Sequence, residues 1–96
     1  MTSKERAYLR GMANTLDPVF QIGKGGISQQ LLTEMDLCLE KRELIKVALL
    51  QSCEQDAREI CDMAAEQLGA APVQCIGRRF VIYRPSKDKP VIGIRV

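Results

Sequence analysis

Residues 19–27, Val-Phe-Gln-Ile-Gly-Lys-Gly-Gly-Ile, join a short apolar run to a long helical pattern, and the chain is organised around this turn. Its three glycines allow positive φ angles and let another molecule approach the backbone closely. Lys24 supplies the one charged side chain. A basic turn before a helix N-terminus presents unpaired amide N–H groups, which favour an anion such as phosphate. An ordinary strand-to-helix turn is the alternative, and local chemistry leaves both open.

Outward from this turn, the apolar periodicity predicts seven elements in the order α-β-α-β-α-β-β. A capping box of Thr2 and Glu5 begins the first helix, and Asp17-Pro18 ends it. A second possible capping box, Ser52 with Gln55, precedes the third helix, which Gly69 ends. The other predicted elements are strands at 19–22, 44–51, 72–76 and 80–84, a helix at about 28–41, and a hairpin turn at 77–79 tipped with two arginines.

This order indicates an α/β fold of the two-layer α+β type, with a four-stranded mixed sheet. Two strand–helix–strand units imply parallel pairing, and the closing hairpin adds an antiparallel strand. Apolar residues on both faces of 44–51 indicate a central strand. We expect the second and third helices on one face and the first helix on part of the other. Residues 1–86 form the domain and 87–96 a tail, of which 91–96 is either an edge strand or loose.

Composition excludes several classes of function. The chain has 96 residues, no histidine and no Cys-x-x-Cys pair, so a metal site is not expected and the four cysteines are interpreted as reduced thiols. Without histidine, general acid–base catalysis lacks its usual residue, so we expect no enzyme, cofactor or small-molecule substrate. No apolar stretch could span a membrane and no signal peptide is evident, so a cytoplasmic location is expected.

Charge is distributed unevenly along the chain. Residues 52–69 carry five carboxylates and one arginine, a net −4, whereas residues 75–96 carry six cations and one carboxylate, a net +5. One side of the domain is therefore expected to bind a polyanion. Phe80 and Tyr83 fall on opposite strand faces, so no aromatic platform for stacking bases is evident. Contacts to RNA phosphates from Lys24, backbone amides and arginines fit this composition better.

Two further groups of cations are candidates for RNA contact. Arg78 and Arg79 lie at the predicted hairpin, where a merely solvated tip is the alternative. Lys4, Arg6 and Arg10 lie off the apolar stripe of the first helix, and a solvated helix face is the alternative for them. The RNA-binding candidates are thus Gly23, Lys24, Gly25, Gly26, Arg78, Arg79, Lys4, Arg6 and Arg10.

Four co-linear blocks within residues 2–86 resemble the YhbY family, whose members consist of a single CRM (chloroplast RNA splicing and ribosome maturation) domain. The blocks are Tyr8-Leu9-Arg10-Gly11-Met12-Ala13, Gln21 to Ile27, Arg42-Glu43-Leu44-Ile45-Lys46-Val47, and Val73 to Arg78 with Phe80 to Pro85 after it.

The resemblance implies an RNA-binding domain similar to the C-terminal domain of translation initiation factor three. It also implies association with large ribosomal subunit RNA and pre-large-subunit particles during ribosome assembly. The family's Gly-x-x-Gly loop, likened to the backbone clamp of KH domains, corresponds to 23–26. A protein–protein adaptor, using the acidic face of the third helix or the apolar tail, is the alternative function.

Overall fold

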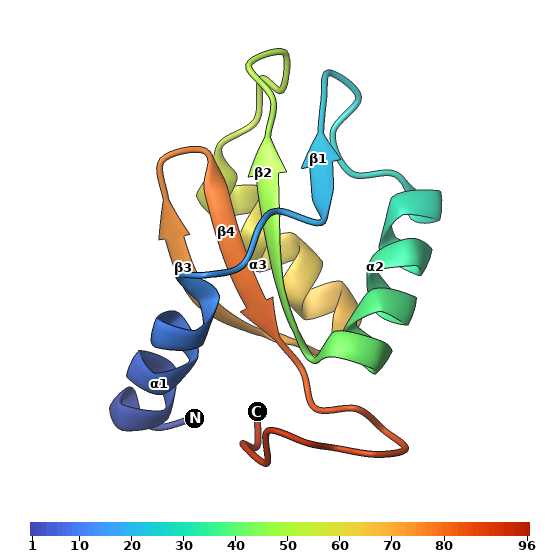
Figure 1. Ribbon diagram of the computed structural model, residues 1–96. Coiled ribbons are helices and arrows are strands. Elements are labelled where there is room, and N and C mark those ends of the chain that lie inside the picture. Colours follow the sequence, from blue (N-terminus) through green and yellow to red (C-terminus); the bar gives the residue numbers. More distant parts are fainter.

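The computed structural model describes residues 1–96 and contains three helices and one four-stranded mixed sheet (Figure 1). The elements are α1 (Ser3–Ala13), β1 (Phe20–Ile22), α2 (Gln29–Arg42), β2 (Leu44–Leu49), α3 (Ala57–Leu68), β3 (Ala71–Ile76) and β4 (Arg79–Tyr83). The predicted fold class and element order are confirmed. None of the three helices has the length and apolar character needed to cross a membrane.

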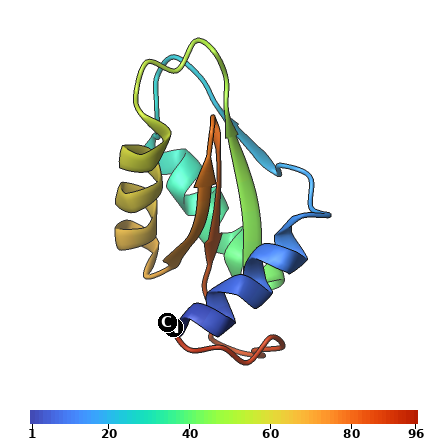
Figure 2. The same cartoon turned by 90° about the vertical axis from the view of Figure 1, so that its left-hand side faces the viewer.

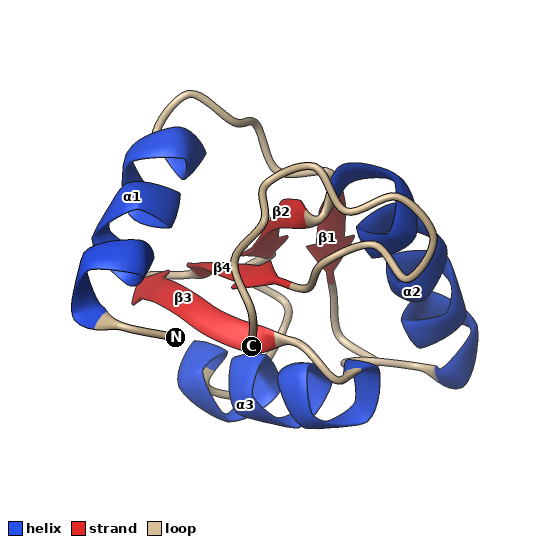
Figure 3. Cartoon of the chain, turned by 90° about the horizontal axis from the view of Figure 1, so that it is seen from below, coloured by secondary structure: helices blue, strands red, loops and turns tan.

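The sheet separates two apolar clusters, as the alternating strand pattern requires. Helices α2 and α3 cover one face, where Met35, Ile60 and Phe80 belong to a cluster of 14 buried residues. Helix α1 lies on the opposite face, where Leu9, Val81 and Tyr83 belong to a smaller cluster of seven. Figures 2 and 3 show the sheet between these helix layers. The predicted distribution of the helices is therefore confirmed.

The sheet order is β1-β2-β4-β3, so the second strand–helix–strand unit does not form the adjacent parallel pair expected from the sequence. β1 and β2 pair in parallel, but β4 lies between β2 and β3 and pairs antiparallel with both. The residue pattern explains this arrangement. Phe80 to Tyr83 are all buried and need cover on both faces, whereas Pro72 lacks an N–H donor and suits an edge strand.

Capping boxes are predicted at the N-termini of α1 and α3, and one of the two is present. In α1, Thr2 Oγ1 accepts the Glu5 amide at 3.1 Å, and Glu5 Oε1 accepts the Thr2 amide at 2.8 Å, so that box is confirmed. The box of Ser52 and Gln55 is wrong, because α3 begins at Ala57 and its N-cap is Asp56, whose side chain caps no amide. Residues 50–56 instead form a loop that buries the Cys53 side chain.

The tail is neither an edge strand nor loose, because two carboxylates fix it to the domain. Half-buried Glu40 accepts the amides of Lys87 and Asp88, at 3.0 and 3.3 Å, and buried Glu43 holds the residues on either side. Glu43 lies between α2 and β2 with φ at +66° and is 3% exposed. Its oxygens accept the amides of Ser86, Val91 and Ile92 at 2.7–3.0 Å. The Tyr83 hydroxyl donates to the Ile94 carbonyl at 2.8 Å, and the Ile94 side chain is buried beside α1. Residues 85–96 therefore cover the part of the α1 face that is drawn lowest in Figure 1, where Tyr83 lies.

Hydrogen bonding sets the ionisation of Glu43. Burial alone would raise its pKa, but the three backbone N–H donors lower it more, so the pKa lies below the ordinary value of 4.5. The carboxylate is thus charged at neutral pH.

The four cysteines are free thiols. Cys53 and Cys61 are buried, whereas Cys38 and Cys75 are half-buried. Burial, with a smaller contribution from the neighbouring Cys75, raises the pKa of Cys61 to about 12. This thiol is therefore protonated at neutral pH and serves as an apolar core residue.

Candidate nucleic-acid interface

Three connecting segments meet at the end of the sheet drawn uppermost in Figure 1: the β1–α2 loop, the β2–α3 loop and the β3–β4 hairpin. Backbone pairing brings the first two together, since the Leu50 amide donates to the Ile22 carbonyl at 2.9 Å. The hairpin joins them through the Leu49 amide, which donates to the Arg78 carbonyl at 2.7 Å. The structure therefore gathers residues 23–26 and 78–79 at one end of the domain.

Residues 23–26 form a β-turn in which the Gly26 amide donates to the Gly23 carbonyl at 3.0 Å. Lys24 and Gly25 occupy the two central positions and are exposed. Only Gly26 has a positive φ, at +69°, and a Cβ there would collide with Gln55 Oε1. The neighbouring loop therefore supports the turn from one side, while the Lys24 ammonium group is presented to solvent.

The N-terminus of α2 follows two residues after this turn. The Ser28 hydroxyl accepts the Leu31 amide at 3.1 Å and so caps one of the orphan N–H groups of the helix. The Gln29 and Gln30 amides have no acceptor within the protein. These two donors and the helix dipole favour an anion at this position, as expected from the sequence.

The two arginines of the hairpin have different roles. The turn consists of Gly77 and Arg78 only, because Arg79 is already the first residue of β4 and pairs with Ile76. One guanidinium nitrogen of Arg78 donates to the carbonyls of Leu50 and Cys53, at 2.7 and 2.6 Å. Arg78 thus braces the β2–α3 loop. The predicted tip with two arginines is corrected, because only Arg78 lies in the turn and Arg79 lies on β4.

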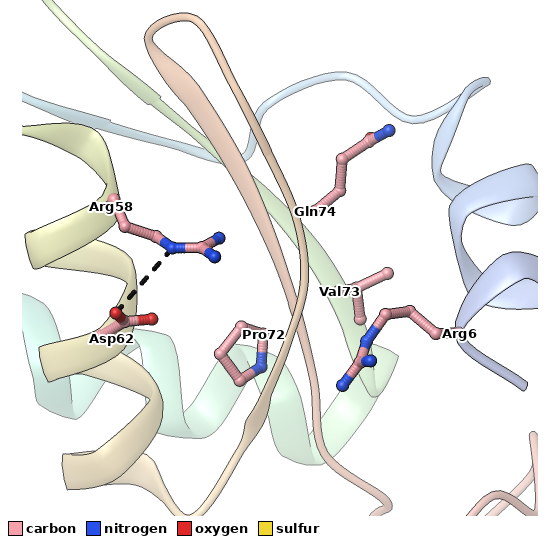
Figure 4. Close-up of a pocket in the computed structure, with 6 residues that line it drawn as sticks. All are labelled: Arg6, Arg58, Asp62, Pro72, Val73 and Gln74. Carbon is pink, nitrogen blue, oxygen red and sulfur yellow. Dashed lines mark ion pairs between the residues drawn. The ribbon is translucent and has the colours of Figure 1, made fainter. Parts of the chain in front are cut away.

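The cations of α1 lie away from these loops, on the α1 face of the sheet. Lys4 is exposed, while Arg6 and Arg10 are half-buried and lie one helical turn apart on the same side of α1. Arg6 helps to line a hollow of about 320 Å³ at the outer edge of β3. In Figure 4, Arg6 and Gln74 lie on one side of β3, and Arg58 lies on the other with Asp62, its ion-pair partner at 4.0 Å.

A second hollow on the α1 face combines the predicted candidate Arg79 with residues that the sequence did not single out as binding residues. Its volume is about 140 Å³, and its lining includes Lys46 of β2, Gln74 and Ile76 of β3, and Arg79 of β4. Gln74 lines this hollow and the one beside Arg6, so the two adjoin. One signal in the sequence could have indicated the site, since Lys46 interrupts an otherwise apolar strand.

Comparisons with known proteins agree on one family. The model of the CRS1/YhbY (CRM) domain matches residues 1–84. "Probable RNA-binding protein YqeI" of Bacillus subtilis is 38% identical over 94 residues, covering 98% of each chain. "RNA-binding protein" of Haemophilus influenzae is 32% identical over 91 residues, covering 95% of this chain and 92% of its own. The solution structure of SAV1595 from Staphylococcus aureus aligns with a TM-score of 0.77 at 45% identity, covering 92% of each chain.

Proposed function

This chain belongs to the CRS1/YhbY (CRM) domain family, and on that premise we propose that it is a cytoplasmic RNA-binding protein that acts in assembly of the large ribosomal subunit. Two observations together support RNA binding. The relatives are named as RNA-binding proteins, and the turn at 23–26 is exposed with a cation at its centre. The role is binding rather than catalysis.

The turn suits contact with the RNA backbone. Lys24 provides a cation without an ion-pair partner in the protein, and the Gln29 and Gln30 amides provide hydrogen-bond donors nearby. Glycine at 25 adds no side chain, and nothing lies within 4 Å of its Cβ position, so a ribose-phosphate chain can approach closely. Such contacts position RNA but read little sequence.

Substituting Lys24 tests the proposed contact. In a filter-binding titration with large-subunit ribosomal RNA, Lys24→Ala should lower affinity and make the slope of log K against log salt shallower by about 0.7–0.9, the value for a single phosphate. Lys41→Ala removes an exposed cation from the C-terminal end of α2 and is the matched control. If Lys24→Ala combined with Gly25→Asp binds as the wild type does, the 23–26 turn is not the site.

The ribosome-assembly role is tested by gradient sedimentation of lysate from cells that make this protein. Migration with pre-large-subunit particles, abolished by ribonuclease, is the expected result. Migration in a ribonuclease-resistant complex would instead support the adaptor function. The structure weakens one basis for that alternative, because Ile94 of the apolar tail packs against the domain. The acidic outer face of α3 remains exposed.

A further inference from the structure

Helix α1 and the tail cover only part of their face of the sheet. The pairing register of the strands shows which rows of residues they cover and which rows they leave uncovered. The covered row consists of Leu44, Tyr83 and Ala71, paired across β2, β4 and β3. The next row toward the loops is Lys46, Val81 and Gln74, and the last is Gln21, Ala48, Arg79 and Ile76. These two upper rows are here called the open half-face. Figure 1 shows α1 lying below them, and the link from α1 to β1 crosses in front of β4 and β2.

The open half-face has an unusual composition for a soluble sheet. The four strands contain two cations, Lys46 and Arg79, and no carboxylate. Both cations lie on this half-face, and neither forms an ion pair within the protein. By contrast, the β2–α3 loop that adjoins the 23–26 turn carries Glu54 and Asp56, both exposed. Asp17, in the link between α1 and β1, lines a neighbouring hollow with Lys46. The strands themselves contribute no negative charge that opposes a polyanion, whereas the β2–α3 loop contributes two carboxylates.

The geometry places the two cations around a single hollow. Lys46 lies opposite Val81, two residues from Arg79 on the neighbouring strand, so the two positions are diagonal neighbours about 7–8 Å apart. Long side chains at that separation can reach the same phosphate group. Both line the 140 Å³ hollow, whose other lining includes Gln74 and the Ile76 side chain, 67% exposed.

Uncharged residues of the half-face offer a second kind of contact. Gln21 and Gln74 each carry an amide that both donates and accepts hydrogen bonds, as base edges do. Ile76 offers an apolar surface against which the body of a base can pack. Side chains cannot read the deep, narrow major groove of an A-form duplex, whereas unpaired bases can turn their edges toward protein side chains. The partner that fits this set of residues is a single-stranded segment.

We propose that the open half-face binds a single-stranded segment of RNA, with a phosphate between Lys46 and Arg79 and unpaired bases against Gln74, Gln21 and Ile76. Through Gln74 the segment reaches Arg6 of α1, and through Arg79 it reaches the loop end of the sheet. The predicted RNA-binding residues of α1 and those of the loops would then contact the same RNA segment. This inference rests on the proposed RNA binding and adds base contacts to the phosphate contacts of the 23–26 turn.

The first test uses the wild-type protein and NMR titration with a pool of random-sequence single-stranded RNA oligonucleotides. The side-chain NH₂ signals of Gln21 and Gln74 and the amide signals of Lys46, Ile76 and Arg79 should shift in fast or intermediate exchange. Shifts confined to residues 23–30 and the hairpin turn would overturn the proposal. They would leave RNA binding by the loop in place.

The second test compares two double variants that change net charge equally. Lys46→Gln with Arg79→Gln should lower affinity for the oligonucleotide pool roughly tenfold. The salt slope should fall by about 0.7, because the two cations share one phosphate. Lys41→Gln with Lys89→Gln removes two exposed cations elsewhere and is the control. Thermal unfolding and the amide spectrum of each variant establish that it is folded.

The outcomes separate the two proposals. If Lys24→Ala weakens binding but the Lys46/Arg79 variant matches the Lys41/Lys89 control, the half-face proposal fails and the loop proposal stands. If the half-face variant weakens binding and Lys24→Ala does not, the half-face proposal stands and the 23–26 turn is not the site. If the wild-type protein binds no RNA, both fail.

Discussion

The two faces of the sheet differ in cover and in charge. The face under α2 and α3 is closed by the larger apolar cluster, and those helices carry six carboxylates and three cations. The opposite face is half covered, by α1 and the tail, and its open part has Lys46 and Arg79 with no strand carboxylate. Adjacent residues of one strand point to these different environments, as Phe80 and Val81 do.

In the proposed complex, this difference lets one thin sheet serve both stability and recognition. Side chains alternate along a strand, so residues that build the closed core leave their neighbours available on the other face. The acidic layer lies behind the sheet as seen by an approaching polyanion, which orients the encounter toward the α1 face. The net charge of +2 conceals this polarity.

The largest effect that separates the faces is expected from truncating Phe80, which is fully buried under α2 and α3. Phe80→Ala should reduce the free energy of unfolding by about 3–5 kcal/mol, because it removes a large apolar side chain and leaves a cavity. Urea unfolding followed by circular dichroism measures the change. Ile76→Ala, on the open half-face, should change it by less than about 0.5 kcal/mol. Equal losses would mean that the two faces do not differ as described.

A smaller effect is expected from Glu43, which holds the tail against the α1 face. Glu43→Gln should cost about 1.5–3 kcal/mol, since charged hydrogen bonds to three amides are replaced by weaker ones. Hydrogen exchange of the Ile92 and Ile94 amides, measured by NMR, should become faster in the variant. Unchanged protection would show that the tail is held without Glu43, by the hydrogen bonds of Glu40 and Tyr83 and the apolar contacts of Ile94.

The same carboxylate predicts how the tail responds to pH. The pKa of Glu43 is lower in the folded protein than its ordinary value of 4.5, so its stabilising contribution is complete above pH 4.5. That contribution is lost as pH falls through the lower folded-state pKa. The tail amides of the wild type should therefore lose protection in acid. In Glu43→Gln this transition should be absent from the Val91 and Ile92 amides, which bond Glu43. The Lys87 and Asp88 amides should keep an acid transition, because they bond Glu40, whose pKa is also lowered by its hydrogen bonds. Persistence at Val91 and Ile92 would show that Glu43 does not control the transition.

The smallest effect on stability is expected at the loop end of the sheet, in the turn at 23–26. Gly26→Ala should cost about 1–2 kcal/mol, because a non-glycine residue is strained at φ +69°. The Gln55 side chain can move away from the new Cβ. Gly25→Ala is the matched control, with open space at its Cβ position, and should change the midpoint of thermal unfolding little. If the two substitutions have equal effects, the turn does not depend on the left-handed conformation of Gly26.

Local patterns predicted most of the fold, because the sequence encodes helix periodicity and strand alternation directly. The stripes of α2 and α3, the Thr2–Glu5 capping box and the central position of β2 all follow from neighbouring residues. The position of β4 between β2 and β3 depends instead on long-range burial of Phe80 to Tyr83. The bracing role of Arg78 depends on two carbonyls more than 20 residues away in the chain. Neither has a local signature.

The candidate site was predicted in part for the same reason. Residues 23–26 have a local signature, and the structure places Lys24 and Gly25 in the exposed centre of a turn. Lys46, Gln74 and Arg79 come from three strands, so only the register of the sheet brings them together. Gln74 lies on the open half-face only because the pairing of β3 with β4 shifts in register between Pro72 and Gln74. This shift places Gln74 opposite Val81. No spacing in the chain reveals that shift.

The bonds from Arg78 to the Leu50 and Cys53 carbonyls have a thermodynamic consequence for association. They tie the hairpin to the β2–α3 loop before any ligand arrives, and Gln55 of that loop in turn rests against Gly26. Little backbone entropy then remains for the protein to lose when these segments contact RNA, so more of the contact energy becomes affinity. Calorimetry of Arg78→Ala should show a more unfavourable binding entropy than the wild type, even though this arginine touches no phosphate in the proposed complex.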